Sequence, residues 1–324
     1  MIRAPRLWPT WLCRAIAWLD FGVLLPALAR TPQSLAMPLL WLRGSVNFAL
    51  DLDWRTLSLR HGYVRRATFD AMRALHSTRW AALRATHRRF VCAAQEECDA
   101  LRLARLDCAR LKVCATGIEE LLALQASGRG VVLLTAHFDA LYVGLAVLAQ
   151  RGLRINLLSS KMIEDPRIPS SIRTHFSNKL AGLNRVLAPG KVVHHEDDVR
   201  FFVDALKRGD LLVIAADGPA TSLRRAVQVQ FLGGLHMMTG GAEFFAAKAQ
   251  VPVCAYACHR LGAANYRVQI SEPLWLEDGG LQAAYDVLDE TIRRSPWRWW
   301  AADLHRTFRT RAALQDAVAT TNDD

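Results

Sequence analysis

The second half of the chain alternates between two patterns of apolar residues. Short runs dominated by Val, Ile and Leu are typical of buried strands, and between several of them the apolar residues return at helical spacing. The predicted strands lie within residues 131–136, 154–159, 211–217, 226–232, 251–258 and 266–275, and the predicted helices within 140–150, 198–209 and 241–250. This alternation predicts a single α/β domain with a largely parallel central sheet flanked by helices.

The beginning of the chain predicts a hydrophobic helical segment that is interrupted by charge. Because Arg14, Asp20 and Arg30 break the apolar pattern, no uncharged run reaches the roughly 18 residues that a membrane-spanning helix needs. Tryptophans beside arginines are typical of a helix that lies in the membrane interface. The same pattern also fits an amphipathic helix packed on its own domain. We expect a membrane-associating segment over 1–45 and an α/β domain over 46–324.

The net positive charge of the chain favours an anionic partner. The chain carries 41 Lys and Arg against 30 Asp and Glu, a formal net charge of +11. The excess is concentrated between Arg55 and Lys112, where apolar residues recur at helical spacing between the arginines. Beside an apolar N-terminus this charge favours an anionic membrane surface or an acidic carrier protein. Nucleic acid is disfavoured because the sequence has no zinc-finger spacing or RNA-binding motif.

The cysteines and a histidine-rich stretch predict neither a disulfide framework nor a metal site. The seven cysteines are odd in number and form no C-x-x-C pair, which fits free thiols in a reducing compartment. We interpret Cys254 and Cys258 as packing thiols within a strand. The stretch "HHEDD" at 194–198 is interpreted as a solvated loop, because adjacent histidines point apart and no ligand spacing accompanies them.

Two of the predicted strands are followed by ionisable residues. His137 stands just past the run 131–136, and Asp217 closes the run 211–217. Active sites in such sheets gather at the carboxyl ends of strands, so His137 is a candidate catalytic residue. The sequence has no G-x-S-x-G nucleophile elbow and no G-x-x-x-x-G-K-[ST] loop. In a group-transfer enzyme these absences would suit direct transfer between two bound substrates without a covalent enzyme intermediate, and no cofactor is expected.

The stretch around His137, "LTAHFDALY", resembles the histidine block of the lysophospholipid acyltransferase superfamily, and more narrowly that of the late acyltransferases of lipid A biosynthesis. Further segments resemble the same family in the same order along nearly the whole chain: "RLWPTWL", "GIEELLALQASGRGVVLLTAHF", "DDVRFFVDALKRGDLLVIAADGPA", "VQFLGGLHMMTGGAEFFAAKAQVPVCAYACHR" and "SPWRWWAADLHRTFRTR". The resemblance implies a glycerolipid acyltransferase-like fold. It also implies transfer of a fatty acyl group from an acyl carrier protein or CoA thioester.

The acceptor that the resemblance implies is a hydroxyl or amine of a lipid A precursor, a related glycolipid or a metabolite. The enzyme would act at the cytoplasmic face of the bacterial inner membrane. In this family an acidic residue stands five positions after the histidine and orients the imidazole, which acts as general base. This chain has Tyr142 at that position, and a neutral phenol brings no negative charge.

Two aspartates are candidates to replace the missing carboxylate. Asp139 is the first, since a tight turn of the backbone would bring its side chain to His137. Asp217, at the end of the neighbouring predicted strand, is the second. Asp139 is also suited to cap the helix predicted over 140–150, and the sequence leaves these roles open.

The resemblance further implies residues that hold the substrates. Lys161 and Arg200 match two basic positions of the family that hold the donor or a phosphate, and Tyr142 is a candidate substrate-binding residue. Thr239, Gly240 and Gly241 open a predicted helix whose free backbone amides would hold a phosphate or an oxyanion.

Tyr142 also leaves open a function of another class. A membrane-associated protein of the same fold that lacks the carboxylate would bind acyl ligands or partners without turnover. A His137→Ala variant separates the two functions, because an enzyme would lose its activity, whereas a binding protein would keep most of its ligand binding.

Overall fold

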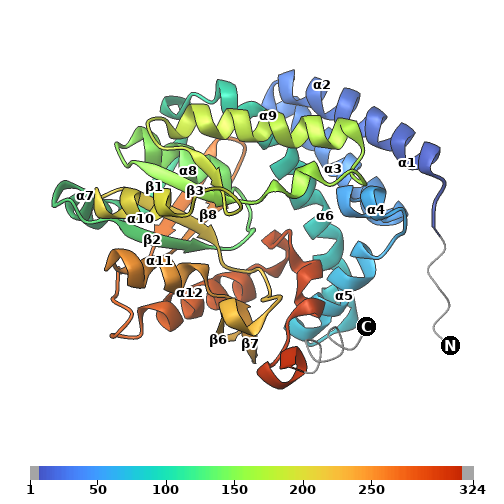
Figure 1. Ribbon diagram of the computed structural model, residues 1–324. Helices are drawn as coiled ribbons and strands as arrows, with labels where there is room; N and C mark the ends of the chain where they lie inside the picture. Colours follow the sequence, from blue (N-terminus) through green and yellow to red (C-terminus); the bar gives the residue numbers. More distant parts are fainter. Residues whose placement is uncertain (1–6, 316–324) are drawn as a thin grey trace.

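A seven-stranded sheet forms the centre of the protein, in the order β1-β9-β8-β2-β5-β3-β4 (Figure 1). The computed structural model describes residues 7–315. The strands are β1 (Lys112–Thr116), β2 (Val131–Thr135), β3 (Ile155–Ser159), β4 (Val192–His194), β5 (Leu211–Ala215), β8 (Val253–Arg260) and β9 (Asn265–Ile270). Neighbouring strands are parallel except for the antiparallel pair β8 and β9. The predicted α/β class with a largely parallel sheet is confirmed.

One predicted strand lies outside this sheet. The run 226–232 forms β6 (Ala226–Phe231), which pairs with β7 (Gly234–Thr239) in a separate two-stranded antiparallel sheet. Toward its end, β6 alternates between buried and exposed residues. Such a half-exposed strand suits a hairpin at the surface better than the interior of a parallel sheet, where both faces are covered.

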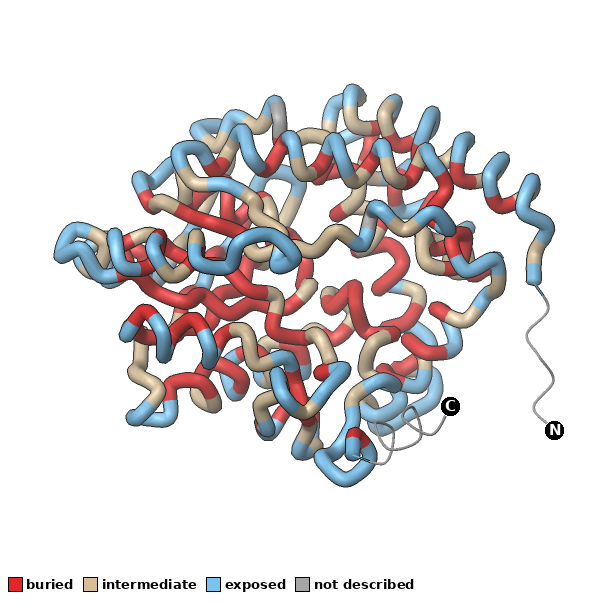
Figure 2. The backbone as a smooth tube through the Cα atoms, in the orientation of Figure 1, coloured by how far each residue is buried: buried red, intermediate tan, exposed pale blue. Residues whose placement is uncertain are grey.

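Helices cover both faces of the sheet (Figure 1). They are α7 (Ile118–Ala126), α8 (Leu141–Gln150) and α9 (Ser170–Leu187) on one face, and α10 (Arg200–Lys207), α11 (Gly241–Ala249) and α12 (Gly280–Arg294) on the other. In β2, Val131 and Leu133 pack with the first set, while Val132 and Leu134 pack with the second. Every residue of β2 is buried as a result, and Figure 2 shows the central strands as buried.

Helices from the first hundred residues pack beside this sheet. They are α1 (Thr10–Ala17), η1 (Trp18–Leu24), α2 (Leu25–Arg30), α3 (Gln33–Leu50), α4 (Trp54–Leu59), α5 (Val64–Leu75) and α6 (Arg79–Arg102). We call residues 10–59 the N-terminal layer. Phe21 and Leu25 of this layer pack in one cluster with Ile172 of α9. Helix α3 runs through residue 45, and the division of the chain at that residue stays a prediction.

The first helical stretch, Thr10–Arg30, is long and apolar enough to cross a membrane by length and composition. About a quarter of it is buried inside the protein: the buried share of its most apolar 18 residues is 28%. The charge of Asp20 does not interrupt the helix, because its carboxylate pairs with the buried guanidinium of Arg43 at 2.6 Å. Asp20 is therefore turned toward the protein.

Candidate active site

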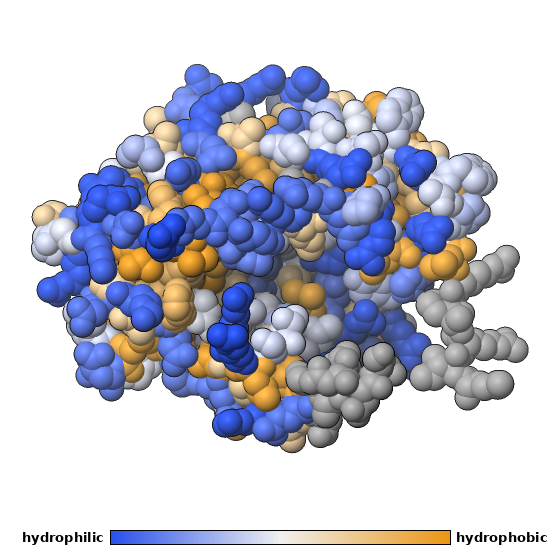
Figure 3. All heavy atoms as spheres, in the orientation of Figure 1, coloured by the Kyte–Doolittle hydropathy of each residue, from blue (hydrophilic) through white to orange (hydrophobic). Residues whose placement is uncertain are grey.

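The paired strands β2 and β5 bring His137 and Asp217 to one edge of the sheet. The two strands are parallel, and their register pairs Thr135 with Ala215. His137 and Asp217 each lie two residues beyond these positions, so they leave adjacent strands at the same level. Figure 3 shows the molecule from the same side as Figure 1, and its surface is hollowed near the centre of this view. In Figure 1, β2 runs toward that centre.

The Asp217 carboxylate is fully buried and accepts three hydrogen bonds. Its Oδ1 lies 2.7 Å from Nδ1 of His137, and its Oδ2 accepts from the backbone N–H of His137 at 2.9 Å and from the Trp299 indole at 2.7 Å. Burial alone would raise the pKa of Asp217, but His137 and these hydrogen bonds outweigh it and hold the pKa below its ordinary value. Asp217 is therefore ionised at neutral pH.

This contact defines the state of the imidazole. An ionised carboxylate can only accept, so Nδ1 of His137 carries a proton, and in the neutral imidazole Nε2 then presents its lone pair. The His137 side chain is 32% exposed, whereas that of Asp217 is not exposed at all. The Trp300 ring packs edge-on against the imidazole, with 4.8 Å between the ring centres. The imidazole is thus fixed from two sides and open toward solvent.

Asp139 points to different partners. The backbone does turn tightly there, with a φ of 42°, but the carboxylate accepts from the Arg260 backbone N–H at 2.7 Å and pairs with the Arg298 guanidinium. Burial raises the pKa of Asp139 to about 6 against the charge of Arg298. The expected helix cap is also not formed: the N-cap of α8 is Ala140, and no side chain caps it. Among the predicted partners, Asp217 contacts Nδ1 of His137.

Tyr142 lies beside the site rather than in the role of the family's carboxylate. Its ring faces the ammonium of Lys179, with 4.0 Å between Nζ and the ring centre, and lies 6.4 Å from the Trp300 ring. Lys179 is buried and pairs with Glu96 of α6 at 2.7 Å. Burial raises the pKa of Tyr142 and keeps the phenol neutral. Tyr142, Lys179 and Glu96 form a buried polar cluster next to Trp300.

The other predicted binding residues are spread along the same edge of the sheet. Lys161 begins η4 (Lys161–Glu164) and pairs with Asp197 at 2.9 Å, and this contact raises its pKa. Arg200, highly exposed, pairs with Asp198 at 2.9 Å. Both acidic partners belong to the "HHEDD" stretch, so its carboxylates serve as ion-pair partners. Across residues 7–315, no group of three His, Cys, Asp or Glu residues is arranged to hold a metal ion.

Thr239 and Gly240 lie near Asp217, but their own amides are occupied. The Thr239 N–H donates to the carbonyl of Gly218 at 3.2 Å, and the Gly240 N–H donates to that of Arg225 at 2.8 Å. These two amides are therefore not free to hold an oxyanion. The expected packing role of the strand cysteines is confirmed, because Cys254 and Cys258 are free and buried in β8.

The tryptophan pair Trp299 and Trp300 is the part of the site that sequence reasoning missed. These residues follow α12 by only a few positions, far from both strands in the sequence. The available signal was the "WRWW" run in the closing segment that carries the family resemblance. That run indicated a preserved segment, but it did not indicate that one indole binds Asp217 and the other packs on His137.

A family model described as bacterial lipid A biosynthesis acyltransferase matches residues 104–310, which is more than half of the chain. The matched range includes His137, Asp217 and both tryptophans. No curated protein matches the sequence.

Proposed function

The chain belongs to the bacterial lipid A biosynthesis acyltransferase family and is an acyltransferase, and on this premise we propose that His137 is the general base of its reaction. The donor in this proposal is a fatty acyl thioester of acyl carrier protein or CoA. The acceptor is a hydroxyl or amine of a lipid A precursor or a related glycolipid. The observation that carries the proposal is the contact between Nδ1 of His137 and the buried, ionised Asp217.

The proposed mechanism is a direct transfer. Nε2 of His137 takes the proton from the acceptor as its oxygen or nitrogen attacks the thioester carbonyl. The tetrahedral intermediate collapses with cleavage of the C–S bond, and the imidazolium returns the proton to the leaving thiolate. Asp217 holds the tautomer that this step requires and stabilises the imidazolium, while the Trp299 indole fixes the carboxylate.

The alternative of a binding protein without turnover was motivated by the missing carboxylate at Tyr142. The carboxylate of Asp217, which follows β5, does contact the imidazole, at 2.7 Å. The absence of a carboxylate at position 142 therefore no longer argues against turnover, and the geometry favours catalysis. Tyr142 stays a candidate to line the site, and the structure adds Lys179 as a second candidate, since both pack beside Trp300.

We also propose that the N-terminal layer docks on the cytoplasmic face of the inner membrane. Its helices expose an unusual share of large apolar side chains: Leu7 just before the layer, then Trp11, Trp18, Leu19, Val23, Leu24, Leu35, Leu39, Trp41, Leu42, Val46, Leu50 and Leu59. Such a concentration indicates an interaction surface. Exposed Arg14 and Arg30 beside these residues suit anionic lipid headgroups.

The test is an acyl-transfer assay followed by mass spectrometry. Purified protein in detergent is given acyl carrier protein or CoA thioesters and a lipid A precursor or a pooled bacterial lipid extract. We expect an acylated acceptor with wild type and none above background with His137→Ala, which keeps its fold by circular dichroism. Thioester binding without transfer by wild type would refute the proposal.

A further inference from the structure

The segment Arg298–Trp300, here called the tryptophan segment, runs antiparallel to His137–Asp139. Backbone hydrogen bonds of 2.8 and 3.0 Å join the two stretches at their ends, and a β-bridge joins their middle residues. One indole of the segment donates to Asp217, and the other packs on the imidazole. The position of this short segment therefore sets the position of both ionisable groups.

A completely buried arginine holds the tryptophan segment from outside the sheet. Arg89 of α6 donates through Nη2 to the backbone carbonyl of Trp300. Its Nη1 donates to Oδ2 of Asp53 at 3.0 Å, and its Nη2 lies 3.6 Å from Oδ1 of Asp303. Asp53 belongs to the N-terminal layer and Asp303 to η7 (Ala302–Thr307), just after the segment.

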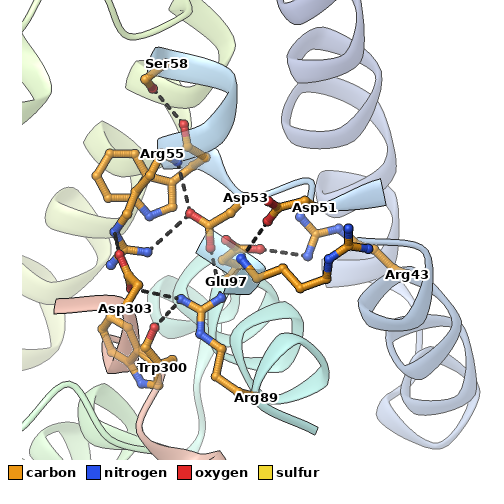
Figure 4. Close-up of polar contacts among 11 residues, drawn as sticks. Arg43, Asp51, Asp53, Arg55, Ser58, Arg89, Glu97, Trp300 and Asp303 are labelled. Atoms are coloured by element: carbon orange, nitrogen blue, oxygen red, sulfur yellow. Dashed lines mark hydrogen bonds and ion pairs between the residues drawn. The ribbon is translucent and has the colours of Figure 1, made fainter. Parts of the chain in front are cut away.

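A second arginine closes these contacts into a ring of four charges (Figure 4). Arg55 pairs with Asp53 at 3.2 Å and with Asp303 at 3.6 Å. The two guanidiniums and two carboxylates balance, and their side chains are between 1% and 14% exposed. Buried charges persist when each is paired, so every member of the ring constrains the other three.

We infer that Arg89 is a positioning residue for the transfer reaction, linking the N-terminal layer to His137 through the tryptophan segment. The inference rests on the proposed role of His137. Arg89 contacts neither the imidazole nor Asp217 directly; it acts through the Trp300 carbonyl. Only a planar fork of donors reaches Asp53, Asp303 and that carbonyl together, and a lysine ammonium lacks this geometry.

As a consequence, the rate of proton transfer at His137 depends on the contacts of Arg89, which lie away from the imidazole. General-base catalysis needs the base within a narrow range of the proton that it takes, and a misplacement of about 1 Å can cost about a hundredfold in rate. Substrate binding does not require the same accuracy. Loss of the Arg89 fork should therefore lower kcat and leave KM nearly unchanged.

The experiment compares Arg89→Lys with Arg43→Lys, the matched control. Arg43 is likewise a buried arginine between two carboxylates, those of Asp20 and Glu97, and it touches no residue of the tryptophan segment in the described contacts. We expect kcat per folded protein to fall about 10- to 100-fold in Arg89→Lys, with KM within about twofold of wild type. We expect kcat of Arg43→Lys to stay within about twofold. Asp303→Asn, nearly isosteric, replaces Arg89→Lys if that variant does not fold.

A second readout does not depend on activity. The His137 ring lies close enough to the Trp300 indole for ring currents to shift its proton resonance, which NMR of histidine-labelled protein detects and His137→Ala assigns. We expect this resonance to move in Arg89→Lys or Asp303→Asn and to stay in Arg43→Lys. An unmoved resonance, or equal losses of kcat in the Arg89 and Arg43 variants, would overturn the inference. If wild type transfers no acyl group, the proposed function fails and the NMR comparison alone decides the positioning role.

Discussion

At the scale of single residues, the imidazole and its carboxylate come from two adjacent strands instead of one short motif. His137 follows β2 and Asp217 follows β5, and the parallel register brings them level. In the family motif that the sequence resembles, the carboxylate would stand at position 142. Here that position holds Tyr142. The ammonium of Lys179, which lies over the Tyr142 ring, is paired with the carboxylate of Glu96. The chain thus keeps an oriented imidazole while the local motif is altered.

Asp217→Asn and Asp139→Asn form a matched pair of tests at this scale. An asparagine at 217 can present its amide N–H₂ to Nδ1 of His137 and favour the wrong tautomer. Removing the equivalent carboxylate from a serine-protease triad costs roughly 10⁴ in turnover, and we expect a loss of kcat of about 10³ to 10⁴. Asp139→Asn should have a much smaller effect on kcat, since it is Arg298 and not the imidazole that loses its partner.

The assay is the same mass-spectrometric transfer, with the folded fraction determined by circular dichroism. If Asp139→Asn abolished transfer while Asp217→Asn retained it, the assignment of the orienting carboxylate to Asp217 would be reversed.

At the scale of elements, α6 shows how far the sequence could predict the fold. Its charge suggested one core face and one basic surface, and the exposed Arg79, Arg84 and Arg88 fit that description. The helix also buries charges that pair with separate elements: Arg89 with Asp53, Glu96 with Lys179 of α9, and Asp99 with Arg260 of β8. Periodicity cannot predict these pairs, because each partner lies 36 to 161 residues away.

The same reason explains which parts of the site were predictable. The strand ends were predictable because continuous apolar runs mark buried parallel strands and the active edge follows from their direction. The choice between Asp139 and Asp217 was not, since it depends on the register of β2 with β5 and on Arg298 holding Asp139 away. The tryptophan segment was not predictable either, because a bridge to a residue 161 positions earlier leaves no local pattern.

The Glu97 carboxylate of α6 predicts a pH dependence of stability. Burial raises its pKa from 4.5 to about 7, although Arg43 opposes this. Between these values the folded protein binds a proton that the unfolded chain releases, so the free energy of unfolding falls as pH rises through this window. Glu97→Gln should remove this contribution and stabilise the protein at pH 8 relative to wild type, by roughly 1–3 kcal/mol.

Chemical denaturation at pH 5 and pH 8 measures the effect. The control is Glu120→Gln on α7, where the side chain is exposed and the difference between the two pH values should match wild type. Asp139, whose pKa is raised to about 6, contributes with the same sign and stays present in both variants. A difference between pH 5 and pH 8 in Glu97→Gln as large as that of wild type would contradict the prediction.

At the scale of the whole molecule, the apolar surface is unevenly distributed. Twelve of the large apolar residues exposed in the described chain lie between Leu7 and Leu50. Trp11 and Trp18, seven residues apart, lie on one face of the first helical stretch and are 71% and 62% exposed. Arginines, rather than acidic residues, are exposed beside them. The molecule therefore has one side that suits lipid and another that suits water.

Trp11→Gln combined with Trp18→Gln should weaken binding to vesicles that contain phosphatidylglycerol. Burial of each large side chain contributes about 1.5 kcal/mol or more, so the partition constant should fall about a hundredfold. Co-sedimentation with vesicles measures it. Phe244→Gln, a substitution of an exposed aromatic residue on α11, should leave partitioning unchanged. Equal binding by the double variant and wild type would exclude this surface as the docking site.

The late position of the tryptophan segment has a consequence for the protein during its synthesis. The ribosome makes the chain from its N-terminus, so the N-terminal layer emerges long before Arg298–Trp300. Until that segment emerges, Asp217 lacks its indole donor and the imidazole lacks its neighbouring ring. On the two proposals above, the N-terminal layer of a nascent chain, or of one cut short by a premature stop codon, is therefore made before the site that would act on thioesters is complete.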